Sequence, residues 1–110
     1  MELFKCSVCN LIIEGESMPD TCPKCGAKKE LIAQLDEAGK DKIFKSERTN
    51  VLLSSLVEVA DKVIALSKEG LDINLDPGCK RVFDFATDKA WEIKQFAKAE
   101  IETHVKKAKW

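Results

Sequence analysis

The stretch KCSVCNLIIEGESMPDTCPKCG, residues 5–26, decides what the N-terminal part of this chain can become. It holds four cysteines in two Cys-x-x-Cys pairs, Cys6/Cys9 and Cys22/Cys25, with twelve residues between the pairs. A Cys-x-x-Cys turn places two sulfurs on one side of a tight loop, so two such turns can enclose one tetrahedral ion from opposite edges. We therefore predict one metal ion bound by Cys6, Cys9, Cys22 and Cys25.

The residues around the cysteines favour two such turns. Each turn requires a left-handed residue just after its second cysteine, a conformation that Gly26 adopts without strain and that Asn10 tolerates better than most residues. The segment between the pairs is interrupted by Gly15 and Pro19 and is predicted to form a hairpin. Residues 1–33 contain too few core-forming side chains to fold without a cross-link such as a bound metal or a disulfide.

This stretch resembles the rubredoxin-like domain of the rubrerythrin family. The shared pattern is an aromatic residue two positions before the first cysteine, a glycine and a proline between the pairs, a Cys-Pro-x-Cys turn and a hydrophobic residue beyond it. In this sequence those positions are Phe4, Cys6, Cys9, Gly15, Pro19, Cys22, Pro23, Cys25 and Leu31. The resemblance covers residues 1–33 and implies one iron ion, held by four thiolates, that cycles between the ferrous and ferric states.

No catalytic site is predicted in the rest of the chain. Rubrerythrins bind two iron ions through paired Glu-x-x-His motifs, whereas His104 is the single histidine here and Ile101 stands three residues before it. We therefore expect no di-iron peroxidase site and no enzymatic activity. His104 is interpreted as a partly exposed helical residue that pairs with Glu100. Cys79, at a helix start that favours a thiolate, is interpreted as a small apolar residue, with a redox-active thiol as the alternative.

The chain beyond the cysteines is divided into a charged linker, residues 34–45, and a domain of two long helices, residues 46–110. Ser46 is the predicted N-cap of the first helix and Gly70 its predicted end. Asp-Pro at positions 76 and 77 suits the start of a second helix of about 30 residues. Apolar residues recur on both helices at spacings of three and four. They are Leu52, Leu56, Val59, Val63 and Leu66, with Leu53, Val57, Ala60 and Ile64 beside them, and then Val82, Ala86, Ala90, Ile93, Ala97, Ile101, Val105 and Ala108.

Both apolar stripes are too wide for one neighbouring helix to cover. We expect a homodimer in which two copies form a four-helix bundle. The alternative is a two-helix hairpin closed by packing against the N-terminal ribbon. The predicted fold class is a small metal-bound β ribbon of the rubredoxin-like type, followed by an α-helical hairpin of two long helices.

The composition argues against two classes of partner. The 18 basic and 19 acidic side chains nearly cancel, so no nucleic-acid partner is expected. No apolar run approaches the length of a membrane span, and the beginning of the sequence has no apolar signal region. We expect no membrane partner and a cytoplasmic location, where closely spaced cysteines bind metal more often than they form disulfides.

Two functions remain open at this point. The first is an electron-transfer protein with one iron ion and a redox partner protein, whose potential is tuned by N–H···S hydrogen bonds and by the apolar residues Leu11, Ile12 and Ile13. The second is a structural zinc ribbon on an oligomerising helical module that acts as an adaptor or regulator. Zinc fits the same four ligands and has no redox chemistry, so the sequence alone does not separate the two metals.

Overall fold

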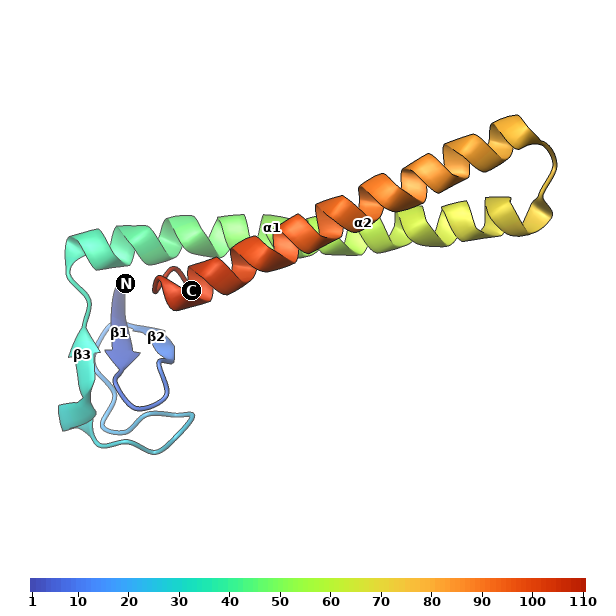
Figure 1. Cartoon of the computed structure of the whole chain (residues 1–110). Coiled ribbons are helices and arrows are strands. Elements are labelled where there is room, and N and C mark those ends of the chain that lie inside the picture. The colour runs from blue at the N-terminus through green and yellow to red at the C-terminus, as the bar shows by residue number, and fades with distance from the viewer. The chain divides into compact units, whose positions relative to one another are not determined.

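The computed structural model describes residues 1–110 and contains a three-stranded sheet followed by two long helices (Figure 1). The helices are α1, Glu37–Ile73, and α2, Pro77–Lys106. These elements confirm the predicted fold class, although dimerisation stays a prediction. The chain divides into two units, residues 1–46 with Trp110 and residues 47–109. The division into a metal-binding ribbon, residues 1–33, and a two-helix domain, residues 46–110, stays a prediction.

The sheet has β1, Glu2–Cys6, at its centre, between β2, Ile12–Gly15, and β3, Ile32–Gln34, with both neighbours antiparallel to it. Alternation along β1 turns Phe4 and Cys6 to one face, where they are 3% and 0% exposed. There they form a buried cluster with Cys22 and Ile32. The core of this small unit is therefore built around two of the predicted metal ligands.

Helix α1 begins at Glu37 and not after Ser46, so most of the predicted linker, residues 34–45, is helical. The Asp36 carboxylate caps the helix, because its Oδ1 accepts a hydrogen bond of 2.7 Å from the Gly39 backbone N–H. Ser46 lies inside the helix and donates its hydroxyl to the carbonyl oxygen four residues back. The predicted start was wrong because charged helix formers extend a helix without any apolar stripe to reveal it.

The end of α1 also differs from the prediction, because Gly70 lies inside the helix and the last helical residue is Ile73. Asn74 follows with φ 52° and its N–H donates to the Gly70 carbonyl oxygen at 3.3 Å, so asparagine takes the left-handed position that ends the helix. Gly70 instead makes room for a ring, since a Cβ added there would lie 2.2 Å from Cε2 of Phe83.

Helix α2 confirms the predicted start and length. Asp76 is its N-cap, and its side chain accepts a hydrogen bond of 2.7 Å from the Cys79 N–H. Pro77 occupies the first position, and the helix contains 30 residues. No helix of the chain combines the length and the apolar character that a membrane crossing requires.

Within residues 47–109 the two helices run antiparallel and side by side (Figure 1). An ion pair of 2.6 Å joins Lys94 Nζ of α2 to Asp61 Oδ1 of α1. The buried side chains of this unit are small or polar, and none is a large aliphatic residue: Asn50, Ala60, Ser67, Ala90, Ala97 and His104. The contact between the two helices therefore buries little of the apolar surface that the sequence provides.

Candidate metal centre

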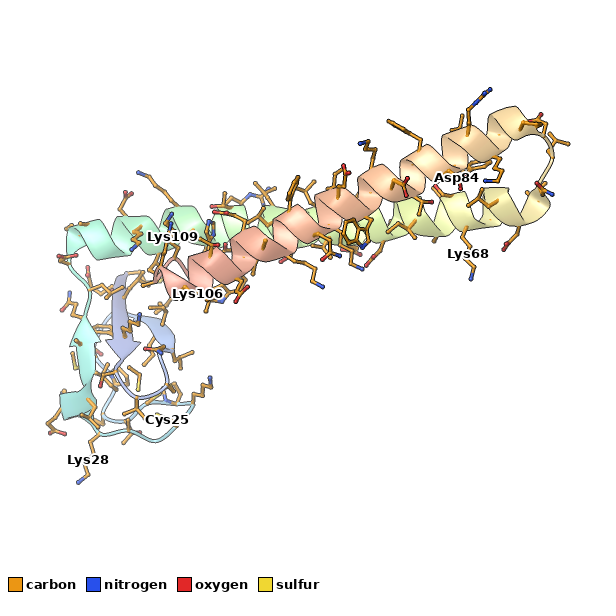
Figure 2. The ribbon with its side chains drawn as sticks, viewed as in Figure 1. Cys25, Lys28, Lys68, Asp84, Lys106 and Lys109 are labelled. Carbon is orange, nitrogen blue, oxygen red and sulfur yellow. The ribbon has the colours of Figure 1, made fainter.

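The four predicted ligands meet in one cluster. The sulfur atoms of Cys6, Cys9, Cys22 and Cys25 all lie within 4.8 Å of one another, and Cys25 is labelled in Figure 2. The Sγ–Sγ distance is 3.7 Å between Cys6 and Cys25 and 3.6 Å between Cys9 and Cys22. In a tetrahedral site with metal–sulfur bonds of about 2.3 Å, neighbouring sulfurs lie about 3.8 Å apart. The donor set and its spacing therefore fit one tetrahedral thiolate-bound ion.

Two similar backbone turns hold these sulfurs. Asn10 and Gly26 adopt the predicted left-handed conformation, with φ 62° and 75°. The Asn10 N–H donates to the Cys6 carbonyl oxygen, and the Gly26 N–H donates to the Cys22 carbonyl oxygen, each at 2.9 Å. Each turn brings backbone N–H groups toward its first sulfur, and this is the arrangement that stabilises a thiolate.

Those N–H groups lower the pKa of two of the thiols, and the crowding of the sulfurs raises the pKa of a third. The pKa of Cys22 is lowered to about 6, chiefly because its sulfur accepts the Cys25 N–H, and burial opposes this effect. The pKa of Cys6 is lowered, chiefly by the Cys9 N–H. For Cys25 the Ala27 N–H favours the thiolate, but desolvation and hydrogen sharing with the other three sulfurs raise the pKa to about 12. Binding of a cation replaces the shared protons.

An apolar layer covers one side of the cluster. Leu11, Ile13 and Met18, together with Ala27, pack against the buried core that contains Cys6 and Cys22. Ile12 is not among these residues, because alternation along the chain turns it away from its neighbours Leu11 and Ile13. The predicted cover of three consecutive residues is therefore corrected to two of them, with Met18 as a contributor that the sequence analysis did not identify.

The hydrophobic residue beyond the second cysteine pair is also reassigned. Leu31 is exposed, whereas Ile32, the first residue of β3, is 5% exposed and packs in the buried core with Phe4 and Cys6. The backbone of Leu31 still serves the site, since its carbonyl oxygen accepts hydrogen bonds from both the N–H and the hydroxyl of Ser7. The β-branched type of residue 32 was the available signal for its place in a strand.

Comparison with known proteins agrees with this geometry. Residues 4–31 match the family model of the rubrerythrin rubredoxin-like domain. The match confirms the resemblance that the sequence indicates. A stretch of 40 residues is 42% identical to reverse rubrerythrin-1 of Clostridium acetobutylicum, and it covers 36% of this chain and 22% of that protein. The chain thus spans about a fifth of the length of the curated relative that it matches. No solved structure is significantly similar to it.

The two other residues singled out in the sequence lie outside the cluster. Cys79 is half-buried at the start of α2, and the hydrogen bond to the Asp76 carboxylate raises the pKa of its thiol, so the expectation of a favoured thiolate was wrong. His104 pairs with Glu100 as expected, with Nε2 3.1 Å from Oε1. It is 8% exposed and thus buried, which corrects the expectation of a partly exposed residue.

Proposed function

We propose that the chain is an electron-transfer protein with one iron ion bound by Cys6, Cys9, Cys22 and Cys25. The observation that carries this proposal is the cluster of four sulfurs at tetrahedral spacing, within residues that match a rubredoxin-like domain. An iron ion bound by four thiolates supplies a one-electron couple between the ferrous and ferric states.

The protein's own groups prepare the site for such an ion. The backbone N–H groups that lower the pKa of Cys6 and Cys22 favour the thiolate form of both sulfurs. The apolar side chains of Leu11, Ile13 and Met18 keep water away from one side of the cluster. Both effects tune the reduction potential of a thiolate-bound metal.

The two sides of the cluster differ in exposure, and this supports a redox partner protein. Cys6 and Cys22 are buried, whereas Cys9 is half-buried and Cys25 is exposed. Beside Cys9, the side chain of Val8 is 59% exposed. We propose that electrons leave through Cys9 and Cys25 to a partner that docks on this edge. The proposal includes a cytoplasmic location, where the thiols stay reduced, and no nucleic-acid or membrane partner.

We propose no enzymatic turnover by the chain itself. Both ring nitrogens of His104, its only histidine, already have partners, Asn50 on one side and Glu100 on the other. Without free imidazoles the helical unit has few ligands for a second metal site, since di-iron bundles use histidine together with glutamate. Purified protein is therefore expected to reduce no peroxide at a measurable rate unless a separate catalyst is added.

The experiment is metal analysis and visible spectroscopy of protein purified anaerobically from its native cells. One iron per chain is expected, with thiolate-to-iron charge-transfer bands that bleach on reduction and return on oxidation. The same measurement on Cys22→Ser, with Cys79→Ser as the matched control, assigns the bands to the cluster. Native protein with stoichiometric zinc and no iron contradicts the proposal, and heterologous expression alone is insufficient because it can load the wrong metal.

The second candidate is a structural zinc ribbon on a helical adaptor or regulator. It is favoured by the small number of apolar side chains in the unit that carries the cysteines, where bound metal contributes folding energy whether or not it changes oxidation state. This candidate is supported over electron transfer if the native protein is colourless, if residues 1–34 unfold when the metal is chelated, and if they refold when zinc is added.

A further inference from the structure

Helix α1 carries two apolar seams, and the chain itself covers only one of them. The inner seam is buried or half-buried and recurs at spacings of four and three residues: Leu53, Val57, Ala60, Ile64, Ser67 and Leu71. The second seam has the same spacing and contains larger side chains: Leu52, Leu56, Val59, Val63 and Leu66. Apart from Val63, its members are 46–67% exposed. Spacings of four and three are those of a helix that packs along another helix, so the second seam has the pattern of an interface.

Helix α2 adds a second row of exposed apolar residues. The members of this row are Val82, Phe85, Ile93 and Phe96. Each of them directly precedes a buried or half-buried residue of α2, and each exposed member of the second seam does the same on α1. A residue that directly precedes a contact residue lies about 100° away from it around the helix axis, to one side of the contact between the helices. Because both helices have the same hand and run in opposite directions, this displacement leads to the same side of the pair. We call the eight exposed residues the apolar face: Leu52, Leu56, Val59, Leu66, Val82, Phe85, Ile93 and Phe96.

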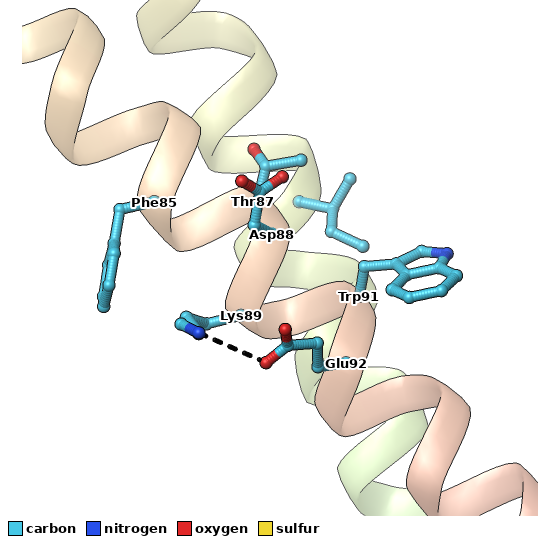
Figure 3. Close-up of a pocket in the computed structure, with 7 residues that line it drawn as sticks. Phe85, Thr87, Asp88, Lys89, Trp91 and Glu92 are labelled. Atoms are coloured by element: carbon cyan, nitrogen blue, oxygen red, sulfur yellow. Dashed lines mark hydrogen bonds and ion pairs between the residues drawn. The ribbon is translucent and has the colours of Figure 1, made fainter.

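The opposite side of the helix pair is different in character. The Asp61–Lys94 ion pair joins the helices next to it, and Trp91 directly follows the buried Ala90. Figure 3 shows Phe85 and Trp91 projecting from opposite sides of α2. A large exposed aromatic residue on the same helix therefore lies outside the apolar face and provides a reference position.

The area of the apolar face matches a protein interface. Eight large side chains, each about half or more exposed, present on the order of 800 Å² of apolar surface at about 100 Å² apiece. A stable interface buries about 800 Å² on each partner, whereas the largest apolar patch of a typical monomer is about 300–600 Å². The face is therefore too large for a solvent-exposed surface and large enough for a dimer.

We propose that a second copy of this chain covers the apolar face through a two-fold axis and forms a four-helix bundle. A two-fold interface applies the same patch to itself, and a long seam with regular helical spacing is suited to this. The charged residues next to Phe85 agree with this choice of partner, because Lys89 and Glu92 are opposite in sign and paired at 3.4 Å (Figure 3). Two copies can therefore meet there without bringing an unpaired charge to the interface. The proposal does not depend on which metal the cysteines bind.

The test is the mass of the 110-residue chain in solution, measured by sedimentation velocity and light scattering from about 1 to 100 μM. Wild type is expected to be a dimer. Leu66→Glu and Phe96→Glu place a charge at positions that are 67% and 78% exposed within one chain, so they are not expected to disturb the helix pair itself. Each is expected to weaken the dimer by roughly 100-fold or more, because every copy buries an unpaired carboxylate. Trp91→Glu, at a position 57% exposed on the other side, is the matched control and is expected to remain dimeric.

Helix content by circular dichroism separates loss of association from loss of folding. If both variants unfold, the wild type alone still decides, because the unfolding temperature of a dimer rises with protein concentration. A wild type that is monomeric and fully helical at 100 μM overturns the proposal and points to a different protein as the occupant. A dimer that survives both variants, or that Trp91→Glu disrupts equally, also overturns it.

Discussion

The Nδ1 atom of His104 faces the Oδ1 atom of Asn50 inside the helical unit, where the two side chains are 8% and 1% exposed. Asn50 also donates its side-chain N–H to the Lys109 carbonyl oxygen at 2.9 Å, and His104 contacts Glu100 through its other nitrogen. This network joins the end of α2 to α1, and no buried side-chain nitrogen or oxygen in the structure lacks a partner. A satisfied polar network of this kind fixes the register of two helices whose other fully buried side chains are small.

Asn50→Ala is therefore expected to destabilise the protein by about 1–3 kcal/mol, because it leaves a buried imidazole nitrogen and a carbonyl oxygen without partners. Urea unfolding followed by circular dichroism at fixed protein concentration measures the change. Ser55→Ala removes an exposed side-chain bond to the Val51 carbonyl oxygen of the same helix and is the control, with an expected change near zero. Equal stability of Asn50→Ala and wild type would show that water replaces the network without loss.

Gly70→Ala is expected to destabilise the protein, although alanine favours an isolated helix by about 1 kcal/mol over glycine. The added Cβ would lie 2.2 Å from the Phe83 ring, so the helices must separate or the ring must leave its place, at a cost of about 1–3 kcal/mol. Gly78→Ala is the matched control, because its Cβ would meet only an Asp76 oxygen at an ordinary 3.5 Å. The unfolding temperatures of the two variants, each compared with wild type, should shift in opposite directions or by clearly different amounts.

The Asp76 cap predicts an acid-dependent loss of stability. Its pKa is lowered from the ordinary value, first because the carboxylate accepts the Cys79 N–H and also because of the Cys79 thiol and the Gly78 N–H. A lowered folded-state pKa contributes stability above the unfolded value, about 3.9, and that contribution is lost as the pH falls through the folded value. Asp76→Asn keeps a good cap without the charge. The stability advantage of wild type over Asp76→Asn should therefore be present at pH 6 and shrink below pH 4, and a constant difference would contradict this cause.

The metal cluster was predictable from the sequence because its determinants are local. The spacing of each cysteine pair and the left-handed positions Asn10 and Gly26 lie within a few residues of one another, and the structure agrees with both. Ile32 was missed for the opposite reason. Its burial depends on the pairing of β3 with Cys6 of β1, a contact that no local pattern marks.

The helices show the same division between local and distant causes. The start of α2 is determined by Asp76 and Pro77, which are adjacent, and it was predicted correctly. The role of Gly70 was misread because Phe83, which requires the space, lies on the next helix. The burial of His104 depends on Asn50, 54 residues away. The pattern of apolar residues indicated one wide stripe on α1, but which part of that stripe faces α2 is decided by the side chains of α2.

The last prediction separates the clustered cysteines from the isolated one. Cys22→Ser is expected to reduce metal retention well below one ion per chain, because its sulfur lies 3.6 Å from Cys9 and its thiolate is the one most favoured by backbone N–H groups. Binding energy at such a site is folding energy, so amide signals of residues 1–34 should collapse to disordered positions in a ¹⁵N spectrum while those of α2 stay in place. Cys79→Ser should retain full metal and an unchanged spectrum of the sheet, since Cys79 is not part of the four-sulfur cluster. Loss of metal in Cys79→Ser together with its retention in Cys22→Ser would show that the ligand set is wrong.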